Sequence, residues 1–159
     1  MQSRIQLVVF GLEAGRYALR LAAVQRVVRA VEVTPLPKAP PIVLGVINVQ
    51  GQIIPVFNLR KRFSLKQRAI EPSNQFIIAA TRTRVIALVV DTVVGVIERL
   101  EKEILAPASI LSDMEYVEGV TKFADGIVFI HDLGGFLSLD EAKQMDEALK
   151  ISEDGADHV

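Results

Sequence analysis

Apolar and polar positions form their clearest pattern around residues 42–57. Two β-branched runs, Ile42–Val49 and Ile53–Phe57, lie on either side of Gln50-Gly51-Gln52. Two short apolar runs around a glycine are typical of a β-hairpin. Pro55 lacks a backbone N–H, so the second strand is expected at a sheet edge, or Pro55 at a bulge. The pattern predicts a hairpin whose second strand has an interrupted ladder.

Similar patterns predict further strands along the chain. They cover residues 5–12, 17–19, 75–80, 85–90, 94–100, 119–123 and 126–130. The first is apolar on both faces, which predicts a strand that is covered on both sides. Leu21, Val24, Val27 and Val28 recur at helical spacing and predict a short helix. Residues 102–116 form a longer, polar and partly irregular stretch.

Two further helices have recognisable starts. Asn58 is a suitable N-cap for one helical turn that ends at Phe63. Ser138 with Glu141 three residues later forms a capping box, which predicts a C-terminal helix over residues 138–150. We expect the acidic residues 152–159 to form a flexible tail.

The chain contains an internal repeat. Gly45-Val46 returns as Gly119-Val120, 74 positions later, and the segment around Gln6 matches the segment around Gln75. Chance matching of apolar positions is the alternative explanation, but the matches keep a constant order. The repeat predicts two similar units, about 5–65 and 74–137, within one domain of residues 1–140.

Composition places the chain in the mainly β class and excludes several kinds of site. Aromatic residues make up 6% and hydrophobic residues 50% of the chain, and most strand patterns are rich in Val and Ile. The apolar excess fits either a Val-rich core or a surface for partners. The absence of cysteine excludes disulfides, thiolate metal sites and cysteine nucleophiles. No apolar run approaches the ~20 residues of a membrane span, so we expect no direct membrane insertion.

Charge is divided unevenly between the two halves. Residues 1–68 carry a net charge of +9 and residues 69–159 a net charge of −10. If each unit forms its own barrel, the molecule has a basic end and an acidic end, and these charges can steer partners. The basic cluster that contains Arg60 and Arg62 fits a solvated face, a protein-docking face or a nucleic-acid site. Few aromatic residues accompany it, which disfavours a single-strand nucleic-acid site.

No constellation of reactive groups indicates an enzyme. The only histidines are His131, at a position that matches Phe57 in the repeat, and His158 near the C-terminus. No cluster has metal-ligand spacing, and no glycine-rich loop carries the lysine of a phosphate site. Asp91 and Asp132 fall at strand ends, where turn or capping roles are usual. The sequence predicts no catalytic residue, no metal and no cofactor.

Several short motifs along the chain carry a family resemblance. They are Phe10-Gly11-Leu12, Tyr17-Ala18-Leu19, Val24-Gln25-Arg26-Val27, Thr34-Pro35-Leu36-Pro37, Gly45-Val46-Ile47-Asn48, Gly51 to Arg60, Ala87 to Asp91 and Gly119-Val120. Together these motifs resemble the CheW family of chemotaxis adaptors. The resemblance covers residues 4–138 and is most specific between Gly45 and Arg60. It implies two tandem SH3-like five-stranded β-barrels with short helices and a C-terminal helix.

The resemblance also implies a function and partners. It implies a non-enzymatic, cytoplasmic scaffold that couples the tips of membrane-associated chemoreceptors to the regulatory domain of a CheA-type histidine kinase. It implies no nucleic-acid partner. The competing interpretation is a β-barrel protein that binds nucleic acid or a small ligand, and the basic first half supports it.

Positions that match the family suggest the contact residues. The resemblance implies kinase contacts at Val8, Leu21 and Val24, although each also fits an ordinary core position. It implies receptor contacts at the hairpin tip formed by Asn48, Gln50 and Gly51. The family usually has an arginine where this chain has Gln50, which keeps hydrogen-bonding reach but loses the charge. Arg60 and Arg62 are the expected steering charges.

Overall fold

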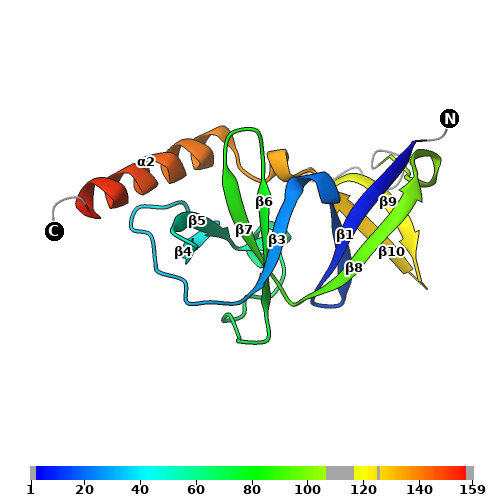
Figure 1. The fold of residues 1–159 in the computed structure, drawn as a ribbon, viewed down its shortest axis with the longest axis horizontal. Helices are drawn as coiled ribbons and strands as arrows, with labels where there is room; N and C mark the ends of the chain where they lie inside the picture. The colour runs from blue at the N-terminus through cyan, green and yellow to red at the C-terminus, as the bar shows by residue number, and fades with distance from the viewer. Residues whose placement is uncertain (1–2, 107–116, 125, 157–159) are drawn as a thin grey trace.

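A computed structural model describes residues 3–106, 117–124 and 126–156. Figure 1 shows two bodies of strands side by side, with a long C-terminal helix beside one of them. The strands are β1 (Arg4–Leu12), β2 (Gly15–Arg20), β3 (Val24–Arg29), β4 (Val43–Val49), β5 (Gln52–Phe57), β6 (Gln75–Ala80), β7 (Val85–Val90), β8 (Thr92–Leu100), β9 (Val117–Phe123) and β10 (Gly126–His131).

The described residues form few helices. They are the 3-10 turns η1 (Leu21–Ala23), η2 (Glu101–Glu103) and η4 (Leu133–Gly135), and the α-helices α1 (Leu59–Arg62) and α2 (Leu139–Ala156). Asn58 caps α1, because its side chain accepts a hydrogen bond from the Lys61 N–H at 3.2 Å. The capping box at α2 is also formed, with the Ser138 N–H donating to Glu141 at 2.9 Å and the Glu141 N–H donating to Ser138 at 3.1 Å. Both predicted caps are confirmed.

The strands form two five-stranded sheets of equivalent strand order. One sheet has the order β8-β1-β2-β10-β9, which we call barrel A, and the other has β3-β6-β7-β5-β4, which we call barrel B. Each contains one parallel pair, β2 with β10 and β5 with β7. The predicted mainly β architecture of two five-stranded units is confirmed, and it is consistent with SH3-like barrels.

The two barrels do not correspond to the two repeat units, which corrects the expected division at 5–65 and 74–137. Barrel A takes β1 and β2 from the first unit and β8, β9 and β10 from the second, and barrel B takes the remaining strands. The repeat is nevertheless present, because β1–β5 occupy the same sheet positions as β6–β10. The units have exchanged their first two strands, so each barrel is built from both.

The repeated Gly-Val pair closes each barrel. Val46 exchanges backbone hydrogen bonds with Thr34 at 2.8 and 2.9 Å, and Val120 does the same with Leu105 at 2.9 and 2.8 Å. A Cβ on Gly45 would lie 2.2 Å from the Thr34 carbonyl oxygen, so only glycine lets the closing segment pass. A Cβ on Gly119 would lie 2.5 Å from a side-chain carbon of Ile104.

Within the described part of the chain, three apolar clusters form the core. Leu7, Val9 and Val128 belong to the interior of barrel A. Phe76 and Ile78 belong to the interior of barrel B. The third and largest cluster joins both barrels to α2, and it includes Phe10, Leu12, Leu19, Phe57, Ile77, Leu88 and Met145. The first strand is therefore covered on both faces, as its two-sided apolar pattern predicts.

Other local expectations need correction. Residues 21–28 form η1 followed by β3 rather than one helix, and a register shift between Val24 and Arg26 explains why the apolar spacing looked helical. β5 is not an edge strand. Pro55 is tolerated there because the ladder with β7 pairs only Val56 and Phe57.

The predicted C-terminal helix was also too short. The predicted helix 138–150 continues to Ala156, so residues 152–156 are helical rather than a flexible tail, and residues 157–159 lie outside the described part. Within the predicted irregular stretch 102–116, residues 107–116 likewise lie outside it. No helix among the described residues is long and apolar enough to cross a membrane.

Candidate partner-binding surfaces

The three residues expected to contact a kinase lie in different environments. Val8 is only 3% exposed, so this side chain is core and cannot present a contact surface. Leu21 in η1 and Val24 at the start of β3 are partly exposed, and Val24 packs against the core cluster between the barrels. Only Leu21 and Val24 can therefore reach a partner directly.

The predicted hairpin tip is present between β4 and β5. Gln50 and Gly51 have positive φ angles of 51° and 86°, as expected for the central residues of a tight hairpin turn. Asn48 holds the turn, because its side chain accepts the Gly51 N–H at 2.9 Å. The Gln50 side-chain oxygen accepts a hydrogen bond from Arg26 on β3 at 3.1 Å. The tip is exposed and carries a positive charge, although position 50 itself is neutral.

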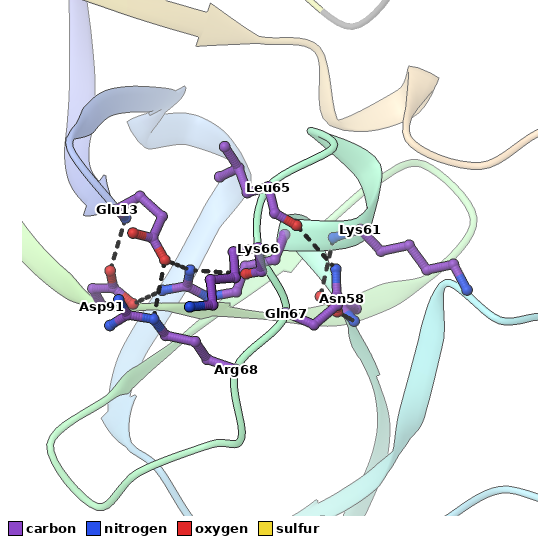
Figure 2. A network of polar contacts seen from close by, with 9 residues as sticks. Glu13, Asn58, Lys61, Leu65, Lys66, Gln67, Arg68 and Asp91 are labelled. Carbon is purple, nitrogen blue, oxygen red and sulfur yellow. Dashed lines mark hydrogen bonds and ion pairs between the residues drawn. The ribbon is translucent and has the colours of Figure 1, made fainter.

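Arg60 belongs to a polar network where the two barrels meet. Figure 2 shows Glu13, Asp91 and Arg68 of this network close together. The Arg60 side chain is 10% exposed and forms two ion pairs. One is with Glu13 on the β1–β2 turn, and the other, at 2.5 Å, is with Asp91, which lies between β7 and β8. Arg60 also donates to the Lys66 carbonyl oxygen at 3.3 Å. Arg68 pairs with Glu13 from the outside at 3.2 Å.

These contacts fix the charge state of Arg60. Burial alone would lower its pKa, but hydrogen bonds to Asp91 and Glu13 and their negative charges outweigh burial and raise the pKa above the ordinary value. Arg62 is 15% exposed and donates to both carboxylate oxygens of Glu141 on α2, at 2.7 and 2.8 Å. Both arginines are largely buried ion-pair partners within the fold, and their expected role as steering charges stays a prediction.

The strand exchange also removes the expected basic and acidic ends. The strands of barrel A combine three arginines of the first half with second-half strands whose charges cancel, and the strands of barrel B carry only Arg26 and Arg29. Several cations of the first half pair with acids far away in sequence, including Arg4 with Glu98 at 3.1 Å and Arg20 with Glu118 at 2.5 Å. Charge is therefore divided along the chain but not between the barrels.

His131 lies within an aromatic cluster. It is 4% exposed and stacks on Phe63, with 4.4 Å between ring centroids and 20° between planes. Tyr17 and Phe136 flank it at 5.4 and 5.8 Å. Burial raises the pKa of the Tyr17 hydroxyl. No group of three or more potential metal ligands occurs among the described residues.

Sequence reasoning missed the exposed apolar side chains on the outer faces of both barrels. Val96 on β8 is 55% exposed and its repeat counterpart Val27 on β3 is 37% exposed; Ile53 and its counterpart Ile127 are 50% and 47% exposed. A strand with valine at successive outward positions, as in residues 92–98, is the signal that could have identified them. Each barrel thus presents similar apolar positions to solvent.

Comparison with known proteins agrees with this geometry. The family model described as "CheW-like domain" matches residues 6–141. The chain belongs to the CheW-like domain family. A crystal structure of the scaffolding protein TtCheW from Thermoanaerobacter tengcongensis superposes with a TM-score of 0.79 at 32% identity, covering 87% of this chain and 96% of that one.

Relatives of this CheW-like chain occur in distant bacteria. The chemotaxis protein CheW of Rhizobium meliloti is 31% identical over 127 residues, which is 79% of this chain and 77% of that protein. CheW of Treponema pallidum is 26% identical over 148 residues, 89% of this chain and 87% of that protein. Protein FrzA of Myxococcus xanthus is 33% identical over 84 residues, about half of each chain. The similarity therefore extends over both exchanged barrels.

Proposed function

We propose that this protein is a non-enzymatic chemotaxis adaptor that couples chemoreceptors to a CheA-type histidine kinase. The observation that carries the proposal is the match to the CheW-like domain over residues 6–141, together with the similarity to a crystallised scaffolding protein. The equivalent exposed apolar positions on the two barrels support it, because a scaffold needs more than one contact surface. Membrane-associated receptor arrays are the proposed site of action.

For the kinase, we propose a contact that includes Leu21 and Val24. Both side chains are partly exposed beside the junction of the barrels. Leu21→Asp should abolish binding to the regulatory domain of the kinase, because the complex would bury an unpaired charge. An aspartate at Leu139, which is 91% exposed on α2 and outside the proposed contact, provides a control with the same chemistry. Equal binding by wild type and a folded Leu21→Asp variant would remove Leu21 from the contact.

For the receptor, we propose the hairpin tip of Asn48, Gln50 and Gly51. Arg26 supplies the tip with a positive charge through its bond to Gln50. Arg26→Gln should weaken binding of a receptor-tip fragment about tenfold, the scale of one charge-assisted hydrogen bond. Arg29→Gln, on the same strand, is the matched control. If both variants bind like wild type, the positive charge at the tip has no part in receptor recognition.

The direct experiment is retention of the full chain on an immobilised kinase regulatory domain and on single-stranded nucleic acid at ~150 mM salt. The adaptor proposal predicts retention on the kinase domain alone. Retention on nucleic acid alone would favour the rival binding-protein interpretation.

A further inference from the structure

The internal repeat gives counterparts to the three ion-paired residues at the centre of the Arg60 network, which are Arg60, Glu13 and Asp91. The β1–β2 turn, Leu12–Gly15, and the β6–β7 turn, residues 81–84, join strands that pair in the same register. α1 and η4 likewise follow equivalent strands and begin after the equivalent side-chain caps Asn58 and Asp132. The molecule therefore has two equivalent junctions between its barrels, one at each end of the shared core.

The residues at the second junction reverse the charge of the first. The counterpart of Arg60 is Gly134, which has no side chain to fill the gap. The counterpart of Glu13 is Arg82, and the counterpart of Asp91 is Ala22. One junction has a guanidinium between two carboxylates, whereas the other has no central side chain and a cation on its turn.

A cavity of about 450 Å³ lies at this second junction, and we call it the Gly134 cavity. Its apolar wall includes Leu19, Phe57, Ile86 and Leu133, and its polar wall includes Arg82 and Arg84. The volume is within the range of about 300–1,000 Å³ for small-molecule sites, and such sites are mostly apolar with a few polar groups.

The acids around the Gly134 cavity are engaged, while cationic donors remain available. Glu118 pairs with Arg20 at 2.5 Å, and the Asp132 side chain accepts the Gly134 N–H at 3.0 Å. Within the described residues, Arg82 has no ion-pair or hydrogen-bond partner. Arg84 bonds Asp146 of α2 through Nη2 at 2.9 Å, but its buried Nε–H meets no acceptor in the described part of the chain.

We propose that the Gly134 cavity binds a small carboxylate ligand with an apolar body. The carboxylate pairs with Arg82 and the free Nε–H of Arg84, whose planar donors suit a carboxylate. The apolar body lies against Leu19, Phe57 and Leu133. The ligand takes the place that Arg60 fills at the other junction, with its charge reversed to match the reversed turn. This binding site is additional to the partner surfaces above and does not depend on them.

Decanoate is a suitable probe, and decan-1-ol is its uncharged counterpart. Titration of the full chain, followed by amide chemical shifts, should show saturable decanoate binding that shifts Gly134 and Thr83 but not the distant Gly51. Decan-1-ol should bind at least tenfold more weakly, because it lacks the charge that pairs with arginine. No saturable shift at Gly134 up to ~5 mM decanoate, or equal binding of the alcohol, would overturn the proposal.

Two variants test the site separately from the fold. Arg82→Glu restores the sign found at the first junction and should weaken decanoate binding at least tenfold, whereas Arg29→Glu, outside the cavity, should leave binding unchanged. Gly134→Met should block the cavity without changing its charge and should also abolish binding. Urea unfolding establishes that each variant is folded. Equal effects of the Arg82 and Arg29 substitutions, or wild-type binding by folded Gly134→Met, would contradict the assignment.

Discussion

Arg60 offers the sharpest perturbation of the fold, because its largely buried guanidinium links the two barrels through two carboxylates. Arg60→Met keeps most of the side-chain volume and removes the charge, which leaves Glu13 and Asp91 without their shared partner. We expect the two barrels to remain formed, since their interiors do not contain Arg60. The loss should fall on the stability of the whole molecule.

The magnitude follows from the exposure of the two carboxylates. Removing one partner of a fully buried ion pair costs about 3–5 kcal/mol. Glu13 and Asp91 side chains are 29% and 33% exposed, and Glu13 retains Arg68, so hydration and the second pair offset part of this cost. We therefore expect Arg60→Met to lower the free energy of unfolding by about 2–3 kcal/mol.

Arg68→Met is the matched control, because Arg68 pairs with the same Glu13 but its side chain is 56% exposed. Its loss should stay below about 1 kcal/mol. Urea unfolding at neutral pH measures both losses, provided that the dependence on urea concentration is unchanged. A loss in Arg60→Met no greater than that in Arg68→Met would refute the conclusion that the buried network joins the barrels.

Three further predictions concern closure of barrel B and attachment of α2. Gly45→Ala should lower the free energy of unfolding by about 2 kcal/mol or more. The loss should exceed that of Gly119→Ala, because a Cβ at position 45 would meet backbone whereas a Cβ at position 119 would meet a side chain. Equal losses would contradict this. Met145→Ala should cost about 2–4 kcal/mol and Leu139→Ala under 0.5, because their exposed fractions are 0% and 91%; similar losses would mean that α2 does not pack as described. Burial alone would raise the pKa of Glu141, but hydrogen bonds from Ser138 and Arg62 lower it below its ordinary value. The stability advantage of wild type over Glu141→Gln should therefore be full above the ordinary glutamate pKa of about 4.3 and shrink as the pH falls below it; a constant difference would contradict this.

Local pattern was sufficient to predict most strands and both capped helices. Alternating apolar positions follow directly from the two-residue period of a strand, and a central glycine marks a tight turn, so the hairpin around Gly51 was predicted correctly. The repeat of Gly45-Val46 at Gly119-Val120 also identified the residues that close each barrel, although its geometric reason needed the Thr34 contact.

The exchange of strands between the repeat units could not be predicted locally. Which unit completes a barrel depends on long-range pairing, and the parallel ladders that join the units have only two residue pairs each. No turn or periodicity records that choice. The two units have the same pattern, so either pairing would bury similar apolar faces.

The partners of the charged side chains could not be predicted from the local sequence either. Arg60 and Arg62 flank Lys61 in a basic cluster that is typical of a solvated face. Their ion-pair partners nevertheless lie 31 to 79 residues away in sequence. An ion pair at that separation leaves no local signal. For the same reason, the local sequence indicates only that Gln50 lacks the charge of the arginine usual in the family, whereas in the fold Arg26 lies beside Gln50 and supplies a positive charge.

The adaptor proposal is tested most directly by receptor-dependent sedimentation of the kinase. Vesicles carrying receptor cytoplasmic domains are mixed with a CheA-type kinase, with and without this protein, and spun down. The account predicts that the kinase sediments with the vesicles when the wild-type chain is present, and much less with folded Leu21→Asp. Kinase recovery that is the same with and without the chain would contradict the account.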